Sequence, residues 1–261
     1  MTSPFRFRSP ETWRFHEHTS RWTFNTVAKS EEGIPVPSRE DPLAPFLRLP
    51  EPAHDPALEA LLQRRFSCRH YAKDAVSIEG LSSVLHRAYG VLGSSRMGDM
   101  EMLERPVPSG GGMYPLELYV IALNVTALNN GIYHYVPIGS GLELRCEVTV
   151  PSALLTYLFM GQPLVAQAAF VCVITAEFSR LMRKYGDRGY RYVLFEAGHV
   201  AQNVNLAAAS LGLGSCNLGG FFDRELGQLL ELDLEEEFPL YGIAVGVPPN
   251  LERTELRHVV E

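Results

Sequence analysis

Two arginines flank a serine in the stretch RRFSCRHY, with Arg65 two residues before Ser67 and Arg69 two residues after it. Guanidinium groups form bidentate, charge-assisted hydrogen bonds with phosphate, so two of them around a hydroxyl suit a phosphate ester. A basic helix end followed by a turn has the same composition. Taken alone, the stretch is better explained as such a helix end than as a phosphate site.

Two glycine-rich stretches leave the backbone without side chains. The first, PSGGGMYP, covers residues 108–115, and the second, LGLGSCNLGGF, covers residues 211–221. Bare backbone N–H groups let a flat or charged ligand approach closely, so both stretches could bind one. The structural alternatives are a flexible turn for the first stretch and a helix end followed by a loop for the second. Neither stretch matches the phosphate-binding loop of nucleotide hydrolases or the dinucleotide-binding glycine pattern. Together with the arginines, they describe a site for flavin mononucleotide (FMN).

The stretch KYGDRGYRY, from Lys184 to Tyr192, combines three tyrosines with three cations directly before an apolar, alanine-rich segment. A solvated surface would not carry these tyrosines, and a core would not carry these charges. The mixture therefore indicates the edge of a site, although a structural helix start can also carry a Lys–Tyr pair. Lys184 and the positive N-terminus of a helix beginning after Asp187 would both favour the charged phenolate form of Tyr185.

Apolar periodicity predicts the elements that must position these residues. Helical spacing predicts helices over 55–66, 77–92, 151–160, 178–185, 188–211 and 223–232, with Ser77, Asp187 and Asp223 as caps and Gly186 as a helix end. Strand patterns predict strands over 116–125, 131–137, 142–148, 168–177 and 240–248. Helices and strands alternate but a hairpin is present, so the class is α+β rather than doubly wound. Residues 1–55 are predicted to be an irregular N-terminal arm, and residues 56–261 the folded domain.

Charge and cysteine usage exclude several classes of protein. The net charge of -7 and the pI of about 5.7 argue against nucleic-acid binding, which usually needs a basic face. The cysteines are widely spaced and form no CxxC pair, so neither a zinc site nor any other metal site is expected; they are Cys68, Cys146, Cys172 and Cys216. No secretory signal and no membrane-spanning apolar run is present, so a cytoplasmic protein with reduced thiols is expected.

Several motifs in order along the chain make it resemble the nitroreductase superfamily over about residues 60–248. They are RRFSCRHY, PSGGGMYPLELYVIALNV, GIYHYVP, KYGDRGYRYVLFEAGHVAQNVNLAAASLGLG and GGFFD. Within that superfamily the chain resembles the SagB-type dehydrogenases, the azoline oxidases of ribosomal peptide maturation, whose opening segment is similar to FHEHTSR. The resemblance implies a nitroreductase-like fold with a central, mostly antiparallel sheet flanked by helices, FMN as the cofactor, and an intertwined homodimer.

The resemblance also implies roles for particular residues. Those that match the segment holding the FMN phosphate and ribityl chain are Arg65, Phe66, Ser67 and Arg69. Those that match the loop usually supplied to the flavin by the other subunit are Pro108, Ser109, Gly110, Gly111 and Gly112. Those that match backbone donors near the reactive edge of the ring are Leu218, Gly219 and Gly220. Arg253 is the candidate for a further basic residue at the phosphate. Gly112 stands where many family members have Asn, so one hydrogen bond to the ring is lost or is made by backbone.

Lys184 and Tyr185 match the Lys–Tyr pair that azoline oxidases use as a catalytic base. The implied function is an FMN-dependent dehydrogenase that oxidises thiazoline or oxazoline rings to azoles in a peptide during natural-product maturation. Its partners would be a second copy of the chain, an azoline-containing peptide or small-molecule substrate, and a cyclodehydratase complex. Two alternatives stay open: an NAD(P)H-dependent reductase of nitro compounds, quinones or enones, which would need neither residue, and a flavin-binding scaffold subunit of a peptide-modifying complex.

Overall fold

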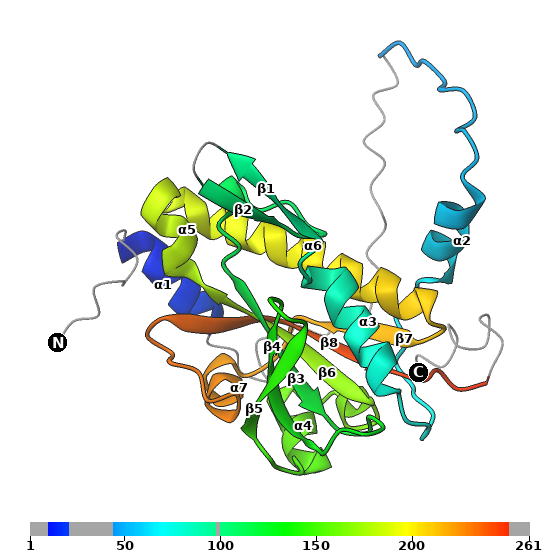
Figure 1. The fold of residues 1–261 in the computed structure, drawn as a ribbon, viewed down its shortest axis with the longest axis vertical. Helices are drawn as coiled ribbons and strands as arrows, with labels where there is room; N and C mark the ends of the chain where they lie inside the picture. Colours follow the sequence, from blue (N-terminus) through cyan, green and yellow to red (C-terminus); the bar gives the residue numbers. More distant parts are fainter. Residues whose placement is uncertain (1–9, 21–43, 98–99, 251–261) are drawn as a thin grey trace.

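A six-stranded antiparallel sheet, in the order β5-β4-β3-β6-β8-β7, forms the centre of the molecule (Figure 1). The computed structural model describes residues 10–20, 44–97 and 100–250. The strands of the sheet are β3 (Leu116–Ala122), β4 (Gly131–Val136), β5 (Gly141–Cys146), β6 (Phe170–Glu177), β7 (Gly214–Leu218) and β8 (Glu237–Gly246). The predicted α+β class with an antiparallel central sheet is confirmed.

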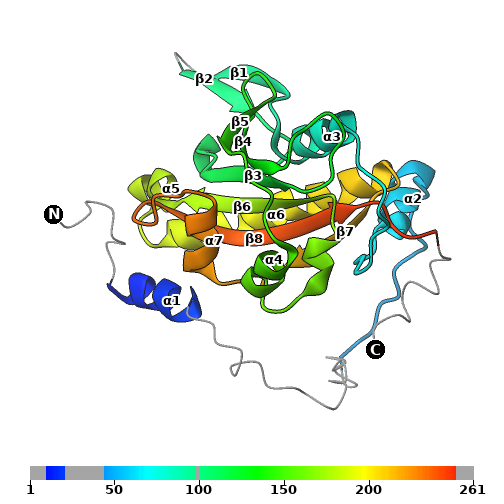
Figure 2. The same cartoon turned by 90° about the horizontal axis from the view of Figure 1, so that it is seen from below.

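Helices cover both faces of this sheet. They are α1 (Pro10–Ser20), α2 (Pro56–Arg64), α3 (Ile78–Tyr89), α4 (Ser152–Leu158), α5 (Phe178–Tyr185), α6 (Arg188–Ser210) and α7 (Asp223–Leu229). Alternate residues of β3 divide between two hydrophobic cores, since Leu118 and Val120 pack with α3 and α6 while Tyr119 and Ile121 pack with α4 and α7. Figure 2 shows α4 and α7 across the sheet from α3. The near-continuous apolar runs of β3 and β6 follow from burial on both faces.

Local signals set several of the helix ends as the sequence predicts. The Ser77 hydroxyl accepts a hydrogen bond from the Gly80 N–H at 3.0 Å and caps α3. Gly186 ends α5 with φ 57°, a conformation that suits glycine. Asp187 is the N-cap residue of α6, as predicted, but its side chain makes no capping hydrogen bond. The prediction for Asp223 is wrong, because Asp223 is the first residue of α7 and the N-cap is Phe222.

Some elements lie in stretches for which no helix or strand was predicted. Helix α1 forms inside the N-terminal arm, and its Trp13 and His16 contact Phe238, with ring centroids 6.3 and 4.6 Å apart. A hairpin of β1 (Gly93–Met97) and β2 (Met100–Glu104) follows α3. Strand β7 forms an edge of the sheet in the second glycine-rich stretch, where no strand was predicted. The division at residue 55 stays a prediction. None of the described helices has the length and apolarity needed to cross a membrane.

His16 makes the stability of the fold depend on pH. Burial lowers the pKa of His16 to about 4, against about 6.5 in an unfolded chain. Because the unfolded state binds the proton first as the pH falls, stability is lost between about pH 6.5 and pH 4. We expect the wild type to lose about 3 kcal/mol more than His16→Gln over this range, measured by urea denaturation. Identical pH profiles for the two proteins would contradict this assignment.

Candidate functional site

The glycine-rich loop meets the Lys184–Tyr185 pair. Residues Gly110–Gly112 form a short 3₁₀ turn in which Gly111 has φ 63° and Gly112 φ 67°. A Cβ on Gly111 would lie 2.6 Å from Lys184 Nζ and 2.8 Å from Tyr185 Oη. The ammonium and the phenol therefore converge on one point of bare backbone, which only glycine leaves free. We call residues 108–112 with Lys184 and Tyr185 the loop cluster.

Arg180 ties the loop cluster to the sheet. Its guanidinium pairs with Glu117 of β3 and Glu177 of β6, each at 2.6 Å, and donates to the Tyr114 carbonyl at 3.3 Å. Glu117 also contacts His134 of β4 at 3.0 Å, and this hydrogen bond raises the pKa of His134. The start of α5 and Tyr114, two residues after the last glycine, are thus fixed to the same strands.

Helix α6 supplies the second wall of the loop cluster. The Tyr192 ring meets the Tyr185 ring edge-on, with centroids 5.1 Å apart. A hollow of about 270 Å³ beside the loop is lined by Pro108, Ser109, Gly110, Tyr192, Phe195, Glu196 and His199. The Glu196 side chain is buried and accepts a hydrogen bond from the Tyr89 hydroxyl at 2.9 Å. Sequence reasoning missed Glu196, although an acid inside the small, apolar segment FEAGHVAQ is a signal that could have found it.

The predicted phosphate-binding residues lie elsewhere, beside β7. Ser67 forms an isolated, parallel β-bridge with Ser215 of β7, and the Cys68 N–H donates a hydrogen bond to the Ser215 carbonyl at 2.8 Å. Leu218 is the last residue of β7, roughly 10 Å along the strand from Ser215, and Gly219 and Gly220 follow it directly. We call residues 65–69 with Leu218, Gly219 and Gly220 the arginine cluster.

Asn217 belongs beside the arginine cluster and was also missed. Its Nδ2 donates to the Tyr241 hydroxyl at 3.2 Å, while its buried Oδ1 has no hydrogen-bond partner among the residues that the structure describes. A buried amide oxygen left unpaired is costly, so this acceptor suits a ligand donor. Asn217 carries no distinguishing pattern in the sequence. Arg253, the remaining predicted phosphate ligand, lies outside the described residues.

The two clusters lie toward opposite ends of α6 in one chain. Figure 1 shows α5 at one end of α6 and α2, which leads into Arg65, at the other. A Cβ on Gly110 would contact Tyr192, whereas the Ser215 hydroxyl donates to Asn205 Oδ1 at 2.9 Å. Roughly 20 Å of helix separates Tyr192 from Asn205. One chain therefore brings the loop together with Lys184 and Tyr185, but does not bring either to the arginines.

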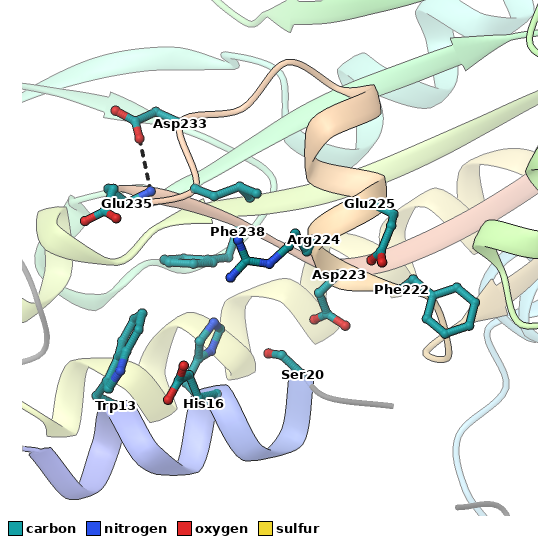
Figure 3. A pocket seen from close by; sticks show the side chains of 12 residues that line it. Trp13, His16, Ser20, Phe222, Asp223, Arg224, Glu225, Asp233, Glu235 and Phe238 are labelled. Carbon is teal, nitrogen blue, oxygen red and sulfur yellow. Dashed lines mark hydrogen bonds between the residues drawn. The ribbon is translucent and has the colours of Figure 1, made fainter. Parts of the chain in front are cut away.

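A larger cavity of about 530 Å³ lies between α1, α7 and the start of β8 (Figure 3). Trp13, His16 and Phe238 form its aromatic side, and Asp223 points toward Ser20. Burial raises the pKa of Asp223 to about 7, against the lowering effect of the Ser20 hydrogen bond. Phe222 lies two residues after Gly220, so the cavity begins close to the arginine cluster. Across the described ranges, no group of three or more His, Cys, Asp or Glu residues is placed to hold a metal ion.

The fold is α+β, and the predicted site residues lie in two clusters toward opposite ends of α6, the longest of the described helices. The model of the nitroreductase family matches residues 62–247. The chain therefore belongs to the nitroreductase family and is an oxidoreductase of that family.

Two curated relatives and one solved structure illustrate the range of similar proteins. "Putative nitroreductase MJ1384" of Methanocaldococcus jannaschii is 38% identical over 189 residues, 72% of this chain and 90% of that protein. The microcin B17-processing protein McbC of Escherichia coli is 28% identical over 172 residues, 64% of this chain but only 61% of McbC. A chain of the E. coli microcin synthetase McbBCD complex with truncated pro-MccB17 bound shares the fold, with a TM-score of 0.69, 23% identity and coverage of 92% of this chain and 94% of that chain.

Gly111→Ala should disturb the loop cluster more than it disturbs the fold. The positive φ costs about 1 kcal/mol for alanine, and the new methyl group would push away Lys184 Nζ and Tyr185 Oη. Gly212→Ala is the matched control, because Gly212 has φ 74° and open space around its Cβ position. We expect similar losses in urea stability for both variants but a tenfold or greater loss of turnover only for Gly111→Ala, roughly the scale for a misplaced reacting group. Equal turnover in both variants would contradict this role of Gly111.

Proposed function

We propose that the protein is an FMN-dependent dehydrogenase that oxidises thiazoline or oxazoline rings in a peptide to azoles during natural-product maturation, in the cytoplasm. The observation that carries this proposal is the convergence of Lys184 Nζ and Tyr185 Oη on the bare backbone of Gly111. A plain flavin reductase needs no such base. The 28% identity to McbC, a peptide-processing protein, supports a peptide as the substrate.

The residues present fit FMN. Arg65 and Arg69 offer two guanidinium groups around Ser67, which suits a dianionic phosphate. Gly110 and Gly111 keep the loop free of side chains where a flat ring could lie, and Asn217 Oδ1 offers an unpaired buried acceptor. In this assignment residues 65–69 hold the phosphate and ribityl chain, residues 218–220 face the ring edge, and the 108–112 loop covers the ring. Arg253 is kept as a further phosphate ligand. Bound FMN supplies the two-electron acceptor that side chains lack.

A homodimer would unite the two clusters. About 20 Å of α6 separates them within one chain, so the loop cluster of a second copy must complete the arginine cluster of the first. Exposed apolar side chains lie near both, with Phe195 60% exposed on α6 and Leu58 and Leu62 about half exposed on α2. Contact between two copies would bury this surface.

The chain's own chemistry is the removal of a proton from a ring carbon. Lys184 and Tyr185 form the base, and the ammonium of Lys184 stabilises negative charge on the Tyr185 oxygen once the phenol proton is lost. The N-terminus of α6 begins just beyond Gly186 and adds positive potential. Tyr192, edge-on to Tyr185, restricts the phenol to its place beside Gly111. One ring hydrogen leaves as this proton, and the other leaves with the two electrons.

A reductase of nitro compounds, quinones or enones is the second candidate. It is favoured by the 38% identity to a protein named as a nitroreductase over most of that protein's length. It would use the same arginine cluster and leave Lys184 and Tyr185 without a catalytic task. A third possibility is a flavin-binding scaffold subunit, which would show no turnover alone. Because a chain of the McbBCD complex shares this fold, we also propose a cyclodehydratase partner that delivers the peptide.

Anaerobic mixing of the purified flavoprotein with an azoline-containing peptide tests the direction of the reaction. We expect bleaching of the flavin absorbance and a product lighter by two hydrogens. Tyr185→Phe should keep the cofactor but slow bleaching by about a hundredfold, the usual scale for a lost acid–base group. Bleaching by NADH or NADPH alone, with none by azolines, would favour the reductase instead.

Mixing two inactive variants tests the shared site. Arg65→Ala with Arg69→Ala removes the phosphate ligands, and Tyr185→Phe removes the base, so each homodimer should be inactive. Coexpressed chains should form mixed dimers in which one site combines an intact arginine cluster with an intact loop cluster. Random pairing predicts recovery of roughly a quarter of the wild-type activity. Absence of any recovery, with mixed dimers demonstrated by mass spectrometry, would show that each chain completes its own site.

A further inference from the structure

Glu196 is a buried carboxyl that the mechanism above does not use. The residue is 2% exposed, and its Oε1 accepts the Tyr89 hydroxyl at 2.9 Å. Its Oε2 has no hydrogen bond of normal geometry within the described part of the chain. A buried carboxylate oxygen without a partner is costly, so the group either holds a proton or waits for a donor. Glu196 also lines the hollow beside Pro108 and Gly110.

Ser109 connects this carboxyl to the loop. Its Oγ accepts the Tyr114 N–H at 2.9 Å, and Ser109 and Glu196 line the same hollow. A serine hydroxyl has one proton and two lone pairs, and Tyr114 already occupies one lone pair. Only the proton and the second lone pair remain for Glu196 and for a ligand in the hollow.

We propose that Glu196 is a positioning residue whose proton decides which hydrogen-bonding group Ser109 presents to the hollow. When Glu196 is ionised it can only accept, so the Ser109 proton turns toward it and the hollow meets a lone pair. When Glu196 is protonated it donates to Ser109 Oγ, and the Ser109 O–H is free to donate into the hollow. One proton on a buried residue thus changes the loop from acceptor to donor.

The groups around Glu196 set the pH at which this change occurs. Burial raises the pKa of Glu196 above its usual value, whereas Ser109, Tyr89 and Arg105 lower it. Arg105 is held over the rings of Tyr89 and Tyr114, 4.3 and 4.7 Å from their centroids. The remaining titratable groups that line the hollow are Tyr192 and His199 of α6. Because the net shift is upward, the change occurs at a higher pH than for an exposed glutamate.

The identity of the ligand rests on the proposed function. The edges of a flavin ring carry more acceptors, namely carbonyl oxygens and ring nitrogens, than N–H donors. A donating Ser109 should therefore hold the ring better, and FMN binding should tighten as Glu196 takes up its proton. One neutral hydrogen bond is worth roughly three- to tenfold in affinity.

The dissociation constant of FMN, measured by flavin fluorescence across a pH series, tests the proposal. Glu196→Gln cannot titrate, and its amide donates to Ser109, so the variant should bind like the acid form at every pH. The FMN phosphate titrates in the same way with both proteins, so its effect cancels in the ratio of the wild-type to the Glu196→Gln dissociation constant. We expect this ratio to rise about three- to tenfold as Glu196 loses its proton with rising pH. Ser109→Ala should lose the effect. Glu237→Gln is the matched control, because burial also raises the pKa of Glu237 but its partners are Thr175 and Tyr119 on the sheet.

Two outcomes would overturn the role of Glu196. One is a ratio of dissociation constants that stays constant across the pH series. The other is an unchanged pH dependence of this ratio when both proteins also carry Ser109→Ala. Tyr89→Phe offers an independent measurement if Glu196→Gln does not fold. Because the Tyr89 hydrogen bond lowers the pKa of Glu196, its removal should move the transition to higher pH, and an unmoved transition would contradict the proposal. Failure of the wild type to bind FMN at any pH would instead refute the proposed function. An infrared band of the protonated Glu196 carboxyl, absent in Glu196→Gln, would then still report its titration without the cofactor.

Discussion

The ion pairs of Arg180 with Glu117 and Glu177 fix the geometry on which the rest of the site depends. They join the start of α5 to the central strands, and the same guanidinium holds the carbonyl of Tyr114. Lys184 and Tyr185 lie one turn further along α5, and the glycines lie just before Tyr114. Since the charges are only partly exposed, loss of one partner would leave another charge poorly solvated. The convergence on Gly111 is thus a consequence of a sheet-anchored arginine rather than of loop contacts alone.

The sequence was sufficient where burial and local chemistry agreed. The continuous apolar runs of β3 and β6, the Ser77 cap of α3 and the glycine after α5 were all predicted, and the family resemblance is confirmed by the match over residues 62–247. Helix α1 was missed because it has weak periodicity and depends on contacts of Trp13 and His16 with distant residues such as Phe238. Strand β7 was missed because Gly and Ser in GSCNL disfavour a strand until β8 pairs with it.

Prediction of the candidate site from sequence was limited in the same way, by contacts between residues distant along the chain. Residue types and spacing indicated the arginines, the glycine loop and the Lys–Tyr pair, each as a separate stretch. No local pattern could show that the loop touches Lys184 and Tyr185 while the arginines lie beside β7, because these contacts join residues more than 70 positions apart. Glu196 and Asn217 were overlooked for a related reason. What distinguishes them is an unpaired buried oxygen, which is a property of the packed molecule.

The distance that α6 places between the two clusters also bears on how the protein responds to its own abundance. If each working site is made by two chains, the number of sites follows the number of assembled pairs. At concentrations well below the pairing constant, that number grows with the square of the chain concentration. Halving expression would then remove about three quarters of the sites, and doubling it would raise their number about fourfold. The length of α6 can in this way make the number of working sites depend on the square of the dosage.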